Sequence, residues 1–366
     1  MLAVKDKVFF LGSGLYVLFC ALAFYSGFIG YRAGAVFLGV VIFVAMLAVS
    51  KLKAGLSFFC IIGMVGCFFT FSLFNFEWSG YRSLFTVFVF VASFGVAWYS
   101  LEFKKTKYFF EFPFIFVLLL TLYLLAFKGY GPADFNKVLF ESSRNVYSGI
   151  LLAFASGYIF SRDYRGKKIS VFLLFLVCLV SIPLYSRNGI FISGVLFFCA
   201  LWQRSVRMAV FFLLAGLVSV VIGWEYINDL IVTNTNLSAG LKSDRYLIMQ
   251  DYFNHLDLFG FFAGVDLSSV PMVEAFGGNP HSAFLRLHSF FGISFFILVF
   301  VSVVSVFLLL YDGKYFLAII LGLYFFRAVF DIFYLFNLFD YLVFPLVFYC
   351  FFRRYRCTTY LERHGC

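Results

Sequence analysis

Apolar runs long enough to cross a lipid bilayer recur along the whole chain, and this pattern constrains the fold more than any single motif does. A helix needs roughly 17 to 25 mostly apolar residues to cross a hydrocarbon core about 30 Å thick. Because lipid offers no hydrogen bonds to an exposed backbone, such runs form helices. We predict twelve spans, at 8–30, 33–50, 54–74, 81–101, 108–127, 146–161, 169–185, 189–203, 206–224, 289–311, 315–329 and 335–352.

The composition agrees with this interpretation. Hydrophobic residues make up 63% of the chain and charged residues only 13%, whereas soluble domains have about 25% charged residues. The first run, 8–30, is not followed by a small-residue cleavage site, so we interpret it as a retained helix and not as a signal peptide. The sequence therefore predicts an all-α, polytopic integral membrane protein that forms a single membrane domain over residues 1–366.

The positive charges in the connections predict the orientation. Lysine and arginine are enriched in cytoplasmic loops, and with the N-terminus inside, 18 of the 28 basic residues fall on the cytoplasmic side. Both termini are then cytoplasmic, and residues 353–366 form a basic cytoplasmic tail. Topology thus accounts for much of the net charge of +10, and no nucleic-acid partner is needed. The 18 residues are Lys5, Lys7, Lys51, Lys53, Lys104, Lys105, Lys107, Arg162, Arg165, Lys167, Lys168, Arg204, Arg207, Lys314, Arg353, Arg354, Arg356 and Arg363.

The eight cysteines do not indicate a disulfide framework or a metal site. Cys357 and Cys366 fall in the tail, where thiols stay reduced, and no cysteine falls in an outer loop. There is no CxxC pair, so a structural metal site is not predicted. The other six fall inside predicted spans: Cys20, Cys60, Cys67, Cys178, Cys199 and Cys350.

The predicted outer face carries the polar sequence. Residues 225–288 form one long loop, and long loops in compact proteins are usually functional or disordered. A helix is predicted at about 243–256, packed on the membrane domain through Tyr246, Met249, Phe253 and Leu256. Two smaller outer connections also carry candidates: residues 128–145 contain Arg144, and "YSRNG" places Arg187 and Asn188 at the outer end of a span.

The stretch "NPHSAFLRLHSFFG" contains two of the four histidines of the chain, His281 and His288, together with Arg286. The seven-residue spacing of the histidines is two helical turns, so both side chains can point the same way. Each histidine also has a simpler interpretation. His281 can be a residue at a helix start with no chemical role, and His288 can be a hydrogen-bonded histidine between helices.

The two loop arginines have simpler interpretations as well. Arg187 can be an interface arginine whose charged end reaches the aqueous boundary. Arg245, in "SDRYLIMQ", can be a solvated charge paired with Asp244. Taken singly, these are weak signals.

Taken in chain order, the motifs resemble a known pattern. The helix-end "SRNG", the loop segment "SDRYLIMQDYFNHLDLFGFFAGVDL" and then "NPHSAFLRLHSFFGISFF" are similar to the superfamily of O-antigen polymerases and O-antigen ligases. In that family a loop arginine precedes a helix and a glycine-rich turn, here Gly260 and Gly264. In the same family a histidine is followed directly by Asn, Ser or Gln, then by nine further residues and a Gly. His281, Ser282 and Gly292 fit this spacing.

The resemblance implies a membrane glycosyltransferase of the GT-C-like type in the bacterial inner membrane, with a periplasmic active site. It covers the whole topology loosely and residues 185–296 more closely. Two positions depart from it: Phe191 stands where many members have Leu, and Phe296 stands where ligases tend to have Gly or Thr. The second departure favours an O-antigen polymerase over a ligase.

The implied substrates are undecaprenyl-diphosphate-linked oligosaccharides, as donor and as acceptor. Arg187 and Arg245 would bind the diphosphate, because a guanidinium binds phosphate oxygens in two places and stays charged. His281 would be the general base, kept neutral by neighbouring arginines. Arg144, Arg286, His288 and Asn188 are secondary candidates. No metal or other cofactor is expected, and membrane lipid and a chain-length-regulating membrane protein are the further partners.

Two alternatives remain open. One is a ligase that transfers the glycan to a lipid A core. The other belongs to a different class, a flippase or transporter of lipid-linked sugars. Transporters place ionisable residues near the midplane and have internal repeats. The ionisable residues here gather at one face, which favours an enzyme working at one surface.

Overall fold

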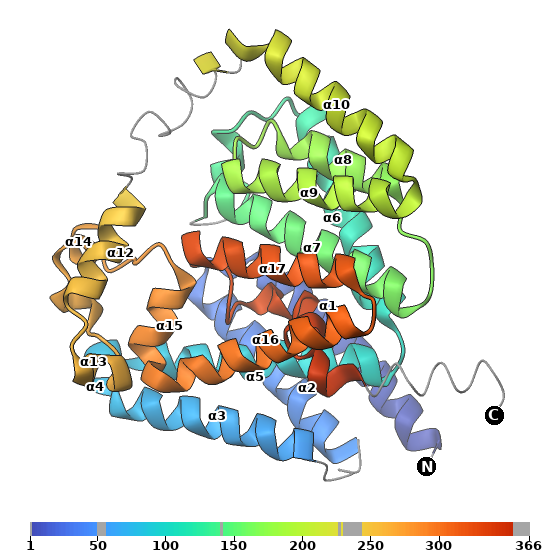
Figure 1. Cartoon of the computed structure of the whole chain (residues 1–366). Coiled ribbons are helices and arrows are strands. Elements are labelled where there is room, and N and C mark those ends of the chain that lie inside the picture. Colours follow the sequence, from blue (N-terminus) through green and yellow to red (C-terminus); the bar gives the residue numbers. More distant parts are fainter. Residues whose placement is uncertain (1, 50–55, 140–141, 226–227, 230–243, 354–366) are drawn as a thin grey trace.

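The computed structural model describes residues 2–49, 56–139, 142–225, 228–229 and 244–353 (Figure 1). The basic tail beyond Arg353 and residues 230–243 of the large loop lie outside this part of the chain. The described residues form helices without any strand, so the all-α prediction is confirmed for them. The long helices are α1 (Leu2–Phe24), α2 (Ile29–Val49), α3 (Leu56–Phe74), α5 (Tyr81–Glu102), α6 (Phe112–Ala126), α7 (Arg144–Tyr164), α8 (Val171–Ser181), α9 (Arg187–Arg204), α10 (Val206–Ile222), α16 (Phe295–Tyr311) and α17 (Tyr315–Phe330).

Several of these helices have the length and composition of membrane spans. Within the described residues, four helices are long and apolar enough to cross a membrane: Ile29–Ala48, Tyr81–Glu102, Lys107–Ala126 and Ala283–Tyr311. The last of these joins α15 (Ala283–Phe291), a short 3-10 turn and α16. Shorter apolar helices accompany them: Gly12–Phe24, Phe59–Phe74, Val171–Ser181, Val206–Ile222 and Tyr315–Phe330.

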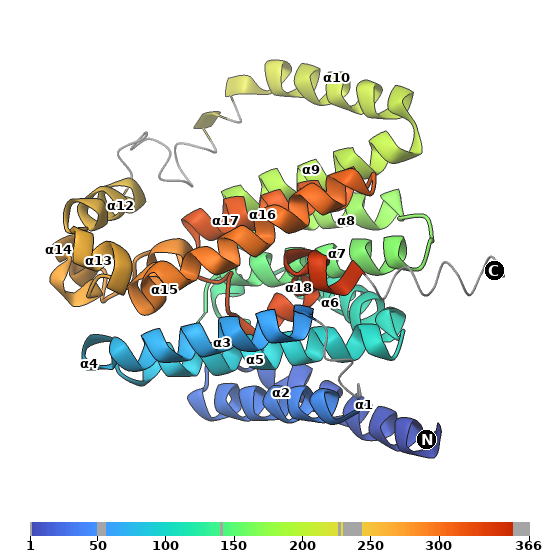
Figure 2. The same ribbon diagram turned by 60° about the horizontal axis from the view of Figure 1, so that its bottom comes forward.

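The helices lie in stacked layers (Figure 2). α2 packs against both α1 and α5, α8 packs against α9, and α10 covers only the outer side of α9. The short helices α12, α13 and α14 gather at one end of the bundle, whereas the start of α1 lies toward the other end (Figure 1). We call these two ends the module end and the ion-paired end.

Ion pairs between neighbouring helices define the ion-paired end. Lys314 lies at the turn between α16 and α17, and its Nζ is 3.0 Å from a carboxylate oxygen of Asp163 in α7. Arg353 pairs with Asp312, and Tyr349 donates to the same carboxylate. Arg165 and Arg162 both approach Glu111, at 2.6 and 3.7 Å. Four basic residues at this end, Arg162, Arg165, Lys314 and Arg353, are thus paired with carboxylates within the protein.

The last predicted span, 335–352, is wrong as a continuous helix. Residues 331–343, the central segment, are irregular apart from the 3-10 turn Leu338–Leu342, and only the four-residue α18 (Phe344–Val347) follows before a final helical turn. Asn337 and Asp340 form a capping box, and Pro345 lies in the first turn of α18. Local polar capping and a proline therefore interrupt the apolar run.

Protein groups satisfy the irregular backbone of the central segment. The Tyr324 hydroxyl accepts from Leu335 N–H, Arg286 donates to the Leu335 carbonyl, and Ser93 donates to the Asn337 carbonyl. Non-helical backbone at membrane depth is stable only where protein surrounds it. The segment is buried accordingly, with Leu335 and Tyr341 fully enclosed.

Residues 244–281 form a compact unit that we call the loop module. It contains α12 (Asp244–Asn254), α13 (Leu258–Ala263), the 3-10 turn Leu267–Ser269 and α14 (Pro271–Ala275). The predicted helix at 243–256 is confirmed, and so is its packing on the membrane helices. The predicted packing face is partly wrong, because Tyr246 and Phe253 are 47% and 56% exposed. The buried core of the module is Ile248, Tyr252, Val265, Val270 and Val273, with Leu285 of α15.

Two glycines and one asparagine attach the loop module to the bundle. Gly264 and Gly292 have positive φ angles of 105° and 50°. A Cβ atom on Gly264 would meet the Ser289 carbonyl oxygen, and one on Gly292 would meet the Phe262 carbonyl oxygen, so only glycine permits this approach. The buried Asn75 side chain bonds both sides of the junction, donating to the Ala263 carbonyl at 2.7 Å and the Phe290 carbonyl at 2.9 Å.

Candidate functional site

His281 lies in the turn that leads from the loop module into α15. Ser282 is the N-cap of α15, so His281 precedes the helix and has a positive φ of 50°. Its backbone N–H donates to Asn279 Oδ1 at 2.9 Å, and its ring meets Phe276 edge-on. A non-glycine residue at positive φ is uncommon and is often found at functional sites. The predicted shared helical face of His281 and His288 is wrong, because only His288 belongs to the helix.

His288 has two hydrogen-bond partners within the protein. Its Nδ1 lies 2.7 Å from the Tyr252 hydroxyl of α12, and its Nε2 lies 3.0 Å from the Phe261 carbonyl of α13. The side chain is buried, 7% exposed. Both ring nitrogens are thus occupied in joining α12, α13 and α15. The simpler interpretation of this secondary candidate, a hydrogen-bonded histidine between helices, fits the geometry.

Arg245 and Arg187 come from different elements at the module end. Arg245 is the second residue of α12, and Arg187 is the first residue of α9, with an exposed side chain. Partial burial lowers the pKa of Arg245, and the charges of Arg187 and Arg327 lower it further, while Asp331 raises it. Four ionisable groups from three separate parts of the sequence therefore lie close together here.

Arg245 also acts on His281. Burial lowers the pKa of the His281 imidazole, and the positive charge of Arg245 lowers it further, against the opposing effects of Asp331 and Asp244. The imidazole is therefore neutral down to a lower pH than an ordinary histidine. This is the protonation state that a general base requires.

Arg327 and Asp331 belong to this group, although the sequence analysis did not select them. Arg327, at the end of α17, is 1% exposed, and its Nε lies 3.6 Å from Asp331 Oδ2. Its Nη2 donates to the Asn145 carbonyl, but Nε and Nη1 have no hydrogen-bond partner among the described residues. Asp331 supplies the anionic partner without which a buried guanidinium is costly, although two of the donors of Arg327 remain unmet. The sequence feature that could have identified Arg327 is a charged residue inside an otherwise apolar predicted helix.

We call Arg187, Arg245, Arg327, Asp331 and His281 the cationic cluster. Its members come from the starts of α9 and α12, the end of α17 and the turn before α15. Within the described part of the chain, neither Arg187 nor Arg245 makes an ion pair. This contrasts with the paired basic residues of the ion-paired end. The module end thus presents positive charge that the described protein does not neutralise.

The remaining secondary candidates occupy separate positions. Arg144 opens α7 and is half-buried, and its backbone N–H donates to Asn136 Oδ1. Asn188 follows Arg187 in the first turn of α9 and is half-buried. Arg286 lies in α15 and reaches the central segment through its bond to the Leu335 carbonyl.

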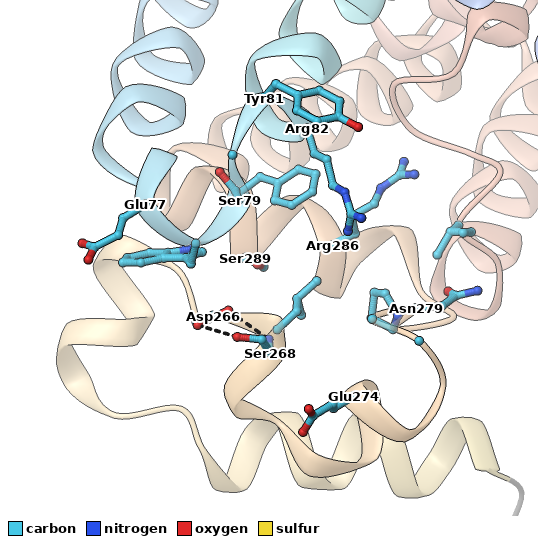
Figure 3. A pocket seen from close by; sticks show the side chains of 18 residues that line it. Glu77, Ser79, Tyr81, Arg82, Asp266, Ser268, Glu274, Asn279, Arg286 and Ser289 are labelled. Atoms are coloured by element: carbon cyan, nitrogen blue, oxygen red, sulfur yellow. Dashed lines mark hydrogen bonds between the residues drawn. The ribbon is translucent and has the colours of Figure 1, made fainter. Parts of the chain in front are cut away.

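A pocket of about 630 Å³ opens beside the cationic cluster (Figure 3). Asn279 and Pro280, the two residues before His281, line it, as does Ile332, the residue after Asp331. Arg82 and Arg286 lie on one side of it, and Glu77 and Glu274 are drawn on other walls (Figure 3). Nothing in the sequence analysis predicted this pocket.

Among the residues that the structure describes, no group of three or more His, Cys, Asp or Glu side chains is placed to hold a metal ion. The fold and the site define a helical chain with membrane-spanning segments and a cationic cluster around a histidine at one end. No protein-family model, curated protein or solved structure matches the chain.

Proposed function

We propose that this chain is a metal-independent glycosyltransferase, an O-antigen polymerase that joins undecaprenyl-diphosphate-linked oligosaccharide repeats. The observation that carries the proposal is the cationic cluster: Arg187 of α9 and Arg327 of α17 lie close enough to Arg245 of α12 to act on its charge, and Arg245 acts on His281. A diphosphate is a ligand suited to such a cluster, because it carries two or more negative charges and guanidinium groups bind its oxygens in pairs.

Each residue then has a defined role. Arg187 and Arg245 bind the donor diphosphate from two sides. Arg327, whose Nε and Nη1 have no hydrogen-bond partner among the described residues, adds positive charge. The acceptor hydroxyl oxygen attacks the anomeric carbon while the bond from that carbon to the diphosphate breaks. The electron pair of that bond leaves with the diphosphate, and the arginines stabilise its charge. His281 takes the hydroxyl proton, so a glycosidic bond, a free lipid diphosphate and an imidazolium result.

The proposal includes a location and a topology. The chain lies in the bacterial inner membrane with both termini cytoplasmic, so the module end is periplasmic. It crosses the membrane twelve times, the last time through the central segment instead of a regular helix. In support, Asp331 belongs to the cationic cluster, whereas Arg353 pairs with Asp312 at the ion-paired end. The two ends of the segment from Asp331 to Arg353 thus lie toward opposite ends of the bundle, which supports a crossing there.

A fusion experiment tests the topology. Alkaline phosphatase folds only in the periplasm, so a fusion near residue 270, in the loop module, should be active. A fusion near residue 314, at the ion-paired end, is the matched control and should be inactive. The reverse pattern would remove the cationic cluster from the compartment where lipid-linked glycans are assembled.

A deletion strain tests the function and separates it from its alternatives. If the chain is a polymerase, gel analysis of the surface polysaccharide should reveal only a single repeat on the lipid A core. Complete long chains that accumulate on undecaprenyl diphosphate would instead identify a ligase. Loss of even single repeats, with lipid-linked repeats trapped inside the cell, would identify a flippase. An unchanged ladder would contradict all three.

Other partners follow from the same proposal. The lipid tails of donor and acceptor remain in the bilayer, so membrane lipid surrounds the helices. A chain-length-regulating membrane protein is the expected protein partner, since nothing in the proposed polymerase reaction itself limits the length of the product. Neither the cluster nor the proposed chemistry needs a cofactor or a nucleic acid.

A further inference from the structure

The pocket beside the cationic cluster is built from three parts of the chain. One wall is Glu77 to Arg82, which includes α4 (Phe76–Ser79) and the start of α5. The loop module contributes 266–268 and Glu274, and the turn before α15 contributes 277–280. α15 closes the inner side with Arg286, Ser289 and Phe290. Its volume of about 630 Å³ falls in the range of roughly 300 to 1,000 Å³ found for ligand sites.

Three of the lining residues have buried polar atoms without a protein partner. Trp78 Nε1, Arg286 Nε and Ser289 Oγ make no hydrogen bond with any described residue. Ser289 is only 1% exposed, so bulk water does not compensate its hydroxyl. Unsatisfied buried groups each cost roughly 1 to 3 kcal/mol, and native proteins contain few of them. These atoms lie just behind the cavity surface, and together they make its surroundings polar.

The charges that line the pocket distinguish it from the cationic cluster. Arg82 and Arg286 are balanced by the carboxylates of Glu77, Asp266 and Glu274. Three carboxylates disfavour a diphosphate or another polyanion, and so many polar groups disfavour an alkyl chain. An uncharged ligand rich in hydroxyl groups fits this balance, because carboxylates accept from hydroxyls and guanidinium groups donate to them.

Aromatic rings complete the lining. Trp78 and Tyr81 offer apolar faces together with a polar N–H or O–H edge. A pyranose ring has the matching character, with C–H groups on its faces and hydroxyls around its rim. Figure 3 shows the Tyr81, Arg82 and Glu77 side chains around the same space.

We propose that this pocket is a carbohydrate subsite that holds the acceptor glycan next to His281. Asn279, which lines the pocket, also accepts the His281 backbone N–H, so the two sites share one turn. The donor diphosphate occupies the cationic cluster and the acceptor sugar occupies the pocket. The assignment to an acceptor rests on the proposed transferase function, whereas binding of carbohydrate in the pocket does not require it.

A binding experiment tests the subsite directly. The probe is the repeat oligosaccharide of the source strain, freed from lipid and diphosphate by mild acid. Ligand-observed NMR with the full chain in detergent should give saturable binding, with a dissociation constant on the order of 1 mM. Glu77→Gln, which nearly preserves shape at an exposed position, and Trp78→Ala should each weaken binding by roughly tenfold. Trp202→Ala, an exposed tryptophan in α9, is the control and should bind as the unmodified chain does.

Competition with inorganic pyrophosphate separates the pocket from the cluster. Pyrophosphate binds arginines, so it should leave glycan binding unchanged if the two sites are distinct. Displacement by pyrophosphate would overturn the proposal, as would the absence of saturable binding or equal binding by the Glu77 and Trp78 variants. Pocket-dependent binding together with an unchanged polysaccharide ladder in the deletion strain would reject the transferase and keep the carbohydrate site.

Discussion

His281→Ala should reduce glycan transfer by a factor of about 10² to 10⁴, the contribution typical of a general base. The protein should still fold in the membrane, because the half-buried ring of His281 has only an edge-on contact with Phe276. His281→Asn is the matched variant. Asparagine tolerates the positive φ at this position but cannot act as a base, so it should be equally inactive. The measurement is polysaccharide length on gels at equal protein level.

His288→Ala should have the opposite effect. It leaves the Tyr252 hydroxyl and the Phe261 carbonyl without their partner, so the amount of folded protein should fall while transfer per folded molecule persists. A normal polysaccharide ladder from His281→Ala would show that His281 is not the general base. Loss of transfer in His288→Ala at a normal level of folded protein would contradict the structural role of His288.

The pH dependence provides a second readout for His281. Burial and the charge of Arg245 lower its pKa from the ordinary value of 6.5. The base is active only when neutral, so transfer should fall as the pH drops through a value below 6.5 and should be constant above it. A loss of transfer that already sets in above pH 6.5 as the pH falls would contradict a lowered pKa of His281.

Arg187→Ala and Arg245→Ala should each nearly abolish chain extension, with losses of about 10² to 10³. Lysine at either position should rescue poorly, because a point charge cannot reproduce the paired bonds of a guanidinium to phosphate oxygens. Arg204→Ala is the matched control, since Arg204 is the exposed last residue of the same helix as Arg187, at its opposite end. It should extend chains normally.

Initial rates with a lipid-linked repeat measure these variants, and membrane fractions verify their expression. Arg144→Ala and Arg286→Ala should lose transfer only in part, because Arg144 opens a different helix and Arg286 lines the neighbouring pocket. Full activity of both Arg187→Ala and Arg245→Ala would refute the diphosphate site. Equal loss in Arg204→Ala would indicate a general effect of charge instead of a specific site.

The long apolar helices up to α17 could be predicted from the sequence because their cause is local. A long apolar run forms a helix wherever lipid or apolar side chains surround it, and each predicted run up to 329 overlaps a helix. The helix at 244–254 was likewise predictable, although its buried face, Ile248 and Tyr252, was not. Burial of one face depends on Val270, Val273 and Leu285, which the spacing within the helix does not reveal.

The site divides in the same way. Motif order sufficed to select Arg187, Arg245 and His281, while only the tertiary structure brought Arg327 and Asp331 to them. The sequence predicts a twelfth helix at 335–352 because that run is apolar, but the central segment is irregular. Its irregular backbone is stable only through partners distant in the chain, such as Ser93 and Arg286. The role of His288 and the pocket walls also depend on contacts between distant segments, whose geometry no local pattern encodes.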